Sequence, residues 1–247
     1  MKKLILHITH ASTNIPYLDG FQIDKQEIDH ELLILTDWHT DDLYEDDDSI
    51  SIVANFSRIF CDPERFTDDG LEPMAKLGMG VLYRQTESGK MMRIVSDELR
   101  SRILNEFYFK HHQKLTEAVK GQLKESGTAL ILDCHSFPDT PLRRNSDQSV
   151  PRPDFNIGTD AFHTRKDLVQ AAMGFFAERN LTCVLNAPFS GSIVPMEYYQ
   201  KNRNVQSIML EVNRRLYLKP GSSERSVDYE QTKNVVHEFI QLMKERM

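Results

Sequence analysis

The chain has 247 residues, with 37 Asp and Glu against 30 Lys and Arg, so its formal net charge is −7. This acidic balance argues against a nucleic-acid-binding protein, which needs a basic face. The sequence has no run of roughly 18 apolar residues and no typical signal peptide, so no membrane association is expected. An odd number of widely spaced cysteines predicts a reduced, cytoplasmic protein without disulfides or a cysteine-rich zinc site: Cys61, Cys134 and Cys183.

Short apolar runs alternate with longer amphipathic segments along the whole chain. The runs rich in Ile, Leu and Val are expected strands: 3–8, 51–56, 129–134, 182–185 and 207–212. The segments with helical apolar spacing are expected helices: 25–35, 37–45, 97–125, 165–179 and 227–245. This alternation predicts an α/β fold with a single domain, residues 1–247, in which a mostly parallel sheet lies between two layers of helices.

A long polar segment rich in proline, residues 138–153, interrupts this alternation. Loops of this length inside a domain are uncommon and often functional. We therefore expect a surface flap that closes over a ligand, carrying Arg143 and Arg144, rather than a domain boundary.

Polar residues stand at or near the ends of the expected strands. They are His10, Arg58, His135, Asn186 and, inside the last apolar run, Glu211. The carboxyl ends of parallel strands meet at one edge of a sheet, where open α/β sheets bind ligands. If the strands are parallel neighbours, these side chains converge there.

His10 and His135 are candidate metal ligands, because a site built from distant residues needs neutral imidazoles and a carboxylate held in fixed directions. The alternative is that each histidine is simply hydrogen-bonded within a loop. Asp37 follows Thr36, a candidate N-cap, which places Asp37 in the first turn of the expected helix. The sequence leaves open whether Asp37 binds an ion or offsets the helix dipole. Asp41, one turn later, is expected to be solvated.

Glu211 lies in the apolar run Ser-Ile-Met-Leu-Glu-Val-Asn. A carboxylate there costs several kcal/mol to desolvate unless it is paired or used. We favour its use as a general base, because burial raises the pKa of a carboxyl group toward neutrality. The alternative is a structural ion pair with Arg214 or Arg215.

Two arginines follow the second expected strand. Arg58 and Arg65 suit an acidic substrate, because the guanidinium group binds carboxylates with two parallel hydrogen bonds. An equally good interpretation is that they pair with Asp62 and stiffen the loop. Further along, Gly191 in a turn-rich loop would allow the backbone to approach a ligand closely.

Other catalytic motifs are missing or unsuitable. The sequence has no GxSxG, P-loop or GxGxxG pattern. Cys134 and His135 are adjacent on an expected strand, so they point to opposite faces and are not expected to form a catalytic dyad. Cys134 is therefore a candidate core residue.

Seven short motifs stand in a definite order along the chain. They are 9–12 with Pro16, 37–44, Ser57-Arg58 with Asp62 and Arg65, 133–136, 153–159, 186–191, and 209–211 followed by Tyr217. Together they resemble the N-formylglutamate amidohydrolase family, whose fold is similar to that of the zinc carboxypeptidases. The resemblance implies a three-layer α/β/α, phosphorylase/hydrolase-like fold with a mixed sheet.

The resemblance also implies an activity, the zinc-dependent hydrolysis of the amide bond in a small acidic N-formyl or N-acyl amino acid such as N-formylglutamate. His10, Asp37 and His135 would bind one zinc ion, or another divalent metal. Glu211 would be the general base and Arg58 would stabilise the oxyanion. Substrate-binding residues would be Arg65, Arg144, Asn186 and Gly191.

One position departs from the family pattern. The family usually has Asn before the second arginine, whereas this chain has Glu64, and a carboxylate there is expected to weaken anion binding. The alternatives are therefore a zinc carboxypeptidase or another deacylase with a different substrate, or a non-catalytic ligand-binding relative. The sequence makes no prediction about oligomeric state.

Overall fold

The computed structural model describes residues 2–247, and at its centre is a six-stranded sheet in the order β2-β1-β3-β6-β4-β5. The strands are β1 Ile5–Ile8, β2 Ile50–Val53, β3 Ala129–Phe137, β4 Phe155–Gly158, β5 Cys183–Leu185 and β6 Val205–Asn213. β2, β1, β3 and β6 are parallel, β4 is antiparallel to β6, and β5 is parallel to β4. The expected mixed, mostly parallel sheet is confirmed.

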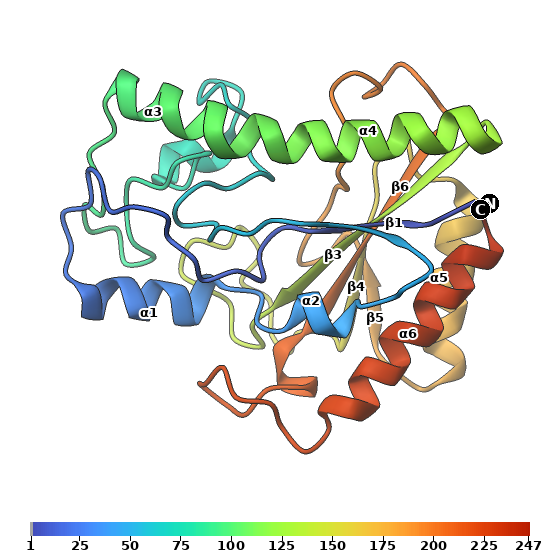
Figure 1. Cartoon of the computed structure of the whole chain (residues 1–247). Helices are drawn as coiled ribbons and strands as arrows, with labels where there is room; N and C mark the ends of the chain where they lie inside the picture. The colour runs from blue at the N-terminus through green and yellow to red at the C-terminus, as the bar shows by residue number, and fades with distance from the viewer. Residues whose placement is uncertain (1) are drawn as a thin grey trace.

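Helices cover both faces of the sheet, as Figure 1 shows, with α4 along one side and α5 and α6 together on the other. The helices are α1 Lys25–Leu35, α2 Thr40–Leu43, α3 Asp97–Ile103, α4 Phe109–Ser126, α5 Lys166–Glu178 and α6 Tyr229–Glu245. A π-helical turn, Leu104–Tyr108, joins α3 to α4, and short 3₁₀ helices span Pro73–Leu77 and Arg214–Leu216. The three-layer α/β/α architecture is therefore confirmed.

Alternation along β3 decides which side chains reach the site. Leu132 and Cys134 join the core against α5 and α6, whereas Ile131 packs against α4. Asp133 and His135 have the same parity as Ile131, so they point to the α4 side of the sheet. Cys134 is buried in the opposite core, as expected, and the three cysteines are free.

Strand β4 was not expected from the sequence, because its four residues include Asn156 and Gly158 and give no clear apolar pattern. It reverses the direction of the sheet beyond β6, so β5 runs opposite to β1, β3 and β6. The condition under which Asn186 was expected at the same edge, a β5 parallel to these strands, is therefore wrong. In the strand register, Leu185 at the end of β5 is level with Ile157 of β4 and thus with Leu210 of β6.

The segment around Asp37 also differs from the expected helix 37–45. Thr36 is the C-cap of α1, and its backbone N–H bonds to the carbonyl of Leu32. α2 begins only at Thr40, after His39, which has a left-handed backbone with φ of 62°. Asp37 therefore lies in the loop between the helices, where its N–H donates to the carbonyl of His10 at 3.0 Å.

The acidic run after Asp37 is only partly solvated. Asp41 is exposed, as expected. Asp42 instead pairs with Lys233 at 2.9 Å, and Asp46 with Lys244 at 2.6 Å. These ion pairs join α6 to α2 and to the segment that follows it.

Candidate metal centre

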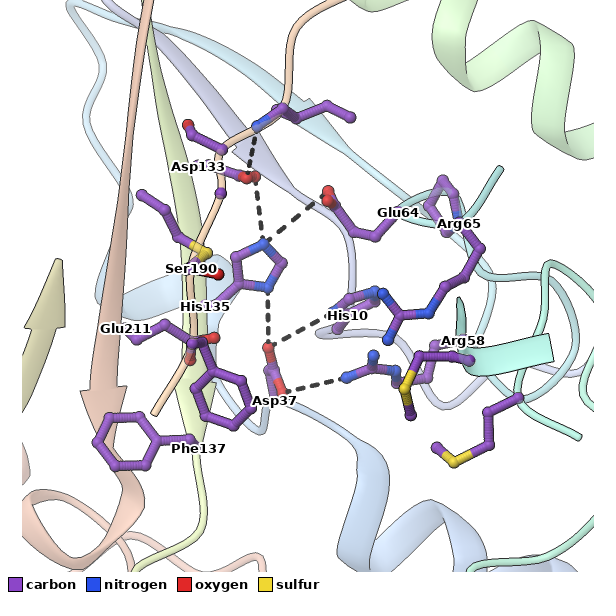
Figure 2. Close-up of a pocket in the computed structure, with 18 of the residues that line it drawn as sticks. His10, Asp37, Arg58, Glu64, Arg65, Asp133, His135, Phe137, Ser190 and Glu211 are labelled. Carbon is purple, nitrogen blue, oxygen red and sulfur yellow. Dashed lines mark hydrogen bonds and ion pairs between the residues drawn. The ribbon is translucent and has the colours of Figure 1, made fainter. Parts of the chain in front are cut away.

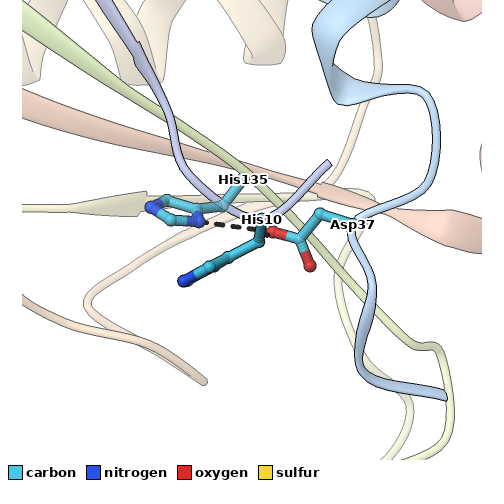
Figure 3. A group of neighbouring side chains, drawn as sticks. All are labelled: His10, Asp37 and His135. Atoms are coloured by element: carbon cyan, nitrogen blue, oxygen red, sulfur yellow. Dashed lines mark hydrogen bonds and ion pairs between the residues drawn. The ribbon is translucent and has the colours of Figure 1, made fainter. Parts of the chain in front are cut away.

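Three buried side chains from distant parts of the chain meet at the carboxyl end of β1 and β3. His10 follows β1, Asp37 follows α1, and His135 lies in β3. Each offers one ligand atom, and these atoms lie within 4.8 Å of one another. Figure 3 shows the Nδ1 of His135 facing Asp37, 3.3 Å from its Oδ2, and the Nδ1 of His10 is 3.6 Å from the same oxygen.

Carboxylates on the far side of both imidazoles define their tautomers. The Nε2 of His10 is 2.9 Å from Oδ1 of Asp62, and the Nε2 of His135 is 3.2 Å from Oδ1 of Asp133. An ionised carboxylate only accepts hydrogen bonds, so each Nε2 carries a proton. In a neutral imidazole, Nδ1 then has a free lone pair. The Nδ1 of His10 is buried and has no hydrogen-bond partner among the described residues.

Asp37 is held in its ionised form. Burial alone would raise the pKa of its carboxyl group, but the adjacent imidazoles of His10 and His135 and the charge of Arg214 hold this pKa well below its usual value. Arg214 donates to Oδ1 at 2.8 Å, and the N–H of Ser136 donates to Oδ2 at 3.2 Å. When both rings are neutral, their two Nδ1 lone pairs and one fixed carboxylate oxygen face a common point, which is the donor set of a metal ion such as zinc.

The pKa of His135 reflects the same concentration of negative charge. Burial alone would lower this pKa, but the carboxylates of Asp133 and Asp37 outweigh burial and raise it well above its usual value. A positive charge is thus favoured at this point, and a proton on His135 or a metal ion would each supply it.

Glu211 stands next to this group, since β6 pairs it with His135 of β3. Its side chain is buried, and Oε2 has no hydrogen-bond partner within residues 2–247. Burial, helped by the charge of Asp37, raises the pKa of Glu211 to about 8. The expected alternative of a structural ion pair does not hold, because Arg214 bonds to Asp37 and Arg215 bonds elsewhere, to Asp139 and Asp154.

Arg58 and Arg65 both approach the site, and both also pair with Asp62. Arg58 donates to Asp62 at 3.1 Å and to the Tyr83 hydroxyl at 3.2 Å, and its Nη1 lies 4.0 Å from Asp37. The Nε of Arg65 is 3.8 Å from Asp62 and, in the described part of the chain, has no hydrogen-bond partner. Figure 2 shows both side chains beside His10 and Asp37, so loop stiffening and substrate contact are compatible roles.

A cavity of about 600 Å³ opens onto these residues, within the range of small-molecule sites. Flap residues 142 and 144–146 form part of its wall, together with Gly191. Arg144 reaches it while donating to the carbonyl of Leu77 and, at 3.1 Å, to the side chain of Gln85. Asn186 lies outside this wall, and its amide instead bonds to Thr159 at 2.9 Å.

A second group of polar side chains, not predicted from the sequence, lies beside the first. The Nδ1 of His7 lies 3.0 Å from Asp133 and 3.1 Å from Glu64, and its Nε2 lies 3.0 Å from the Nε2 of His111. Burial alone would lower the pKa of His7, but the two carboxylates raise it to about 9. Glu64 thus faces a histidine beside the cavity. The only signal in the sequence was a single histidine inside the apolar run 4–8.

A sequence profile of the N-formylglutamate amidohydrolase family matches residues 2–218. The chain belongs to this family. A relative from Pseudomonas aeruginosa, named N-formylglutamate deformylase, is 26% identical, and the match covers 96% of this chain and 91% of the relative.

Two solved structures share the fold of this family member. The N-formylglutamate amidohydrolase of Ralstonia eutropha JMP134 has a TM-score of 0.83 and 22% identity, with 100% of this chain and 95% of that chain covered. A gene product of Agrobacterium tumefaciens has a TM-score of 0.70 and 14% identity, with coverages of 100% and 91%. Among residues 2–247, no helix is long and apolar enough to cross a membrane.

Proposed function

We propose that this protein is a metal-dependent amidohydrolase that cleaves the amide bond of an acidic N-formyl or N-acyl amino acid, with N-formylglutamate as the first candidate substrate. The observation that carries the proposal is the convergence of His10, Asp37 and His135 beside the buried Glu211, whose Oε2 has no hydrogen-bond partner among the described residues. The match to the amidohydrolase family and the name of the Pseudomonas relative support the substrate class.

His10, Asp37 and His135 would hold the ion through Nδ1, Oδ2 and Nδ1 respectively. Two imidazoles and one carboxylate are a typical catalytic zinc set, which leaves a position for water, although another divalent metal would fit the same donors. When bound, the ion would polarise the amide carbonyl and lower the pKa of the attacking water. It would also supply the positive charge that the surrounding carboxylates favour.

Glu211 would act as general base and then as general acid. Its carboxylate takes a proton from the attacking water as the new C–O bond forms at the acyl carbon. It then returns the proton to the amide nitrogen as the C–N bond breaks, which releases formate or another carboxylate and the free amino acid. Burial raises the pKa of this carboxyl group, which makes it a better proton acceptor than an exposed carboxylate.

Arg58 would donate N–H groups to the oxyanion that develops on the carbonyl oxygen. Its bonds to Asp62 and Tyr83 hold it in place before the reaction, and such preorganisation makes electrostatic stabilisation effective. Arg65 has a buried Nε without a hydrogen-bond partner among the described residues and would bind a substrate carboxylate.

The remaining contacts would come from two loops of the cavity wall. Arg144 on the flap would bind a second carboxylate, and the backbone at Gly191 would pass close to the substrate. Asn186 would act only indirectly, by holding the start of the loop that leads to Gly191 through its bonds to Thr159.

A substrate panel tests the proposal directly. The zinc-loaded protein is assayed for free amino acid released from N-formylglutamate, N-acetylglutamate, N-formylleucine and an acidic dipeptide. We expect the acidic N-formyl compound to be cleaved fastest. Preference for the dipeptide would instead support a carboxypeptidase, and binding of the substrates without turnover of any of them would support a non-catalytic relative.

A further inference from the structure

A row of buried polar side chains runs from the candidate metal centre into the interior of the protein. His135 contacts Asp133 at 3.2 Å, Asp133 contacts His7 at 3.0 Å, and His7 contacts His111 at 3.0 Å. All four side chains are buried. His7 and His111 have no role in the proposed reaction.

Secondary structure places these residues in line. The register of β1 and β3 puts His7 beside Asp133, and both point to the α4 side of the sheet, where His111 projects from α4. A strand register fixes every side chain of the pair, so His7 cannot slide away from Asp133 without unpairing the strands.

The Asp133 carboxylate is oriented by three contacts. Its Oδ1 faces both the Nε2 of His135 and the Nδ1 of His7, and its Oδ2 accepts the N–H of Ile193 at 3.0 Å. His7 also faces Glu64 at 3.1 Å, whose other near neighbour is the Nε2 of His135 at 3.9 Å. His7 therefore holds two carboxylates in place around one nitrogen of His135.

This orientation decides which nitrogen of His135 is free. While Asp133 accepts from Nε2–H, the lone pair of the neutral ring is on Nδ1, which faces Asp37 and His10. Without a fixed acceptor at Nε2, the proton can move to Nδ1, and the ring then loses its donor atom toward the shared point.

We propose that His7 is a positioning residue, which locks Asp133 onto the Nε2–H of His135 and so keeps the Nδ1 of His135 available to bind the metal ion. This inference rests on the proposed function in one respect, since it takes His135 as a ligand. It assigns to His7 an effect on metal affinity that acts through Asp133.

The test compares zinc affinity, measured by competition with a chelator, in the full-length protein and two His7 variants. His7→Leu removes the donor to Asp133, and we expect it to weaken zinc binding about 10- to 100-fold, the usual effect of losing an outer hydrogen bond at a zinc site. In His7→Asn, the side-chain amide can replace Nδ1–H, so this variant should recover most of the affinity. The visible spectrum of the Co²⁺-loaded forms should change in His7→Leu and return in His7→Asn.

His163→Leu is the matched control, because His163 is equally buried and hydrogen-bonded, to Val205 and Gln200, but outside this row. If His7→Leu does not fold, His7→Gln is used in its place. The glutamine amide lies where the Nε2 of His7 was and therefore does not reach Asp133. Two results would overturn the proposal. One is wild-type zinc affinity in His7→Leu or its replacement, and the other is a loss of zinc affinity in His7→Asn as large as in that variant. Failure of the wild-type protein to bind any divalent cation would instead contradict the proposed function itself.

Discussion

Glu211 shows how one side chain links stability to chemistry. It is 7% exposed, and its Oε2 has no hydrogen-bond partner in the described residues, which is a costly state for a charged carboxylate. Burial therefore favours the protonated form and raises the pKa to about 8. A group held in this way can exchange a proton with a substrate near neutral pH.

Substitution of Glu211 separates metal binding from catalysis. We expect Glu211→Gln to retain the metal, because the three proposed ligands are intact, and to lower turnover at least ~100-fold, because the amide cannot accept the proton. Metal content and kcat are measured on the same preparation, with the exposed Glu178→Gln as control. Undiminished turnover in Glu211→Gln would remove Glu211 from the mechanism.

The same pKa predicts that Glu211 lowers the stability of the metal-free folded protein in a pH-dependent way. An unfolded carboxyl group titrates near 4.5, whereas the folded group titrates at about 8, so ionisation weakens the folded state as pH rises through this interval. We expect metal-free Glu211→Gln to be more stable than the metal-free wild type at pH 8 and equally stable near pH 4. Urea unfolding at the two pH values measures this gap, and a gap that grows on acidification would contradict the assignment.

The candidate metal ligands could be predicted from the sequence, whereas their supporting residues could not. His10, Asp37 and His135 are marked by family motifs and, for the two histidines, by their positions at strand ends. His7 lies inside a short apolar run, where one polar residue gives little signal. Its role depends on the β1–β3 register and on α4, which local sequence does not specify.

At the scale of elements, long amphipathic or apolar segments were predictable and short ones were not. α1 was expected at its observed bounds, and the central strands were found although β3 extends to Phe137. β4 was missed because four residues with Asn and Gly do not stand out, and its direction decides where Asn186 lies. The direction in which two strands pair depends on the tertiary structure, so the position of Asn186 could not be predicted from the local sequence.

Within the flap 138–153, one buried arginine joins segments that are distant in the loop. Arg152 donates to the carbonyl of Pro138 at 3.1 Å and to Asn145 at 3.1 Å, and its guanidinium lies 5.5 Å from the ring of Phe189. These contacts tie both ends of the flap to the far wall of the cavity. The flap is therefore expected to keep Arg144 over the site while Arg152 is present.

Removal of this arginine should loosen the flap. We expect Arg152→Ala to raise KM severalfold with metal content unchanged, because the substrate contacts of the flap become less ordered while the proposed ligands are untouched. Steady-state kinetics and the rate of proteolytic cleavage within 138–153 check this. Arg179→Ala is the control, because the guanidinium of Arg179 also covers a phenylalanine ring. An unaltered KM together with unaltered proteolysis would argue against the role of Arg152.

At the scale of the whole molecule, the candidate metal site joins segments from both halves of the chain. His10 follows β1, His135 belongs to β3, and Asp37 is anchored by Arg214 beyond β6. An ion bound only by the folded protein stabilises all of these segments together. The chain should accordingly behave as the single domain, residues 1–247, predicted from its sequence.

Metal removal is thus expected to lower the midpoint of one cooperative unfolding transition. At a free zinc concentration of about 100 times Kd, the stabilisation is about 2.7 kcal/mol, which is large enough to shift Tm by several degrees. Calorimetry of chelator-treated and zinc-reloaded protein measures the shift. Two separate transitions would contradict the single domain, and a Tm indifferent to zinc would contradict the site.

The proposed function requires three side chains to bind one ion, and anomalous X-ray diffraction at the zinc edge tests this directly. Crystals of the zinc-loaded protein should give one strong anomalous peak at about 2.0–2.2 Å from the Nδ1 of His10, an oxygen of Asp37 and the Nδ1 of His135. The peak should be lost in His135→Ala and kept in His30→Ala, where an exposed histidine is removed. A peak at another group of residues, or none at saturating zinc, would contradict the account.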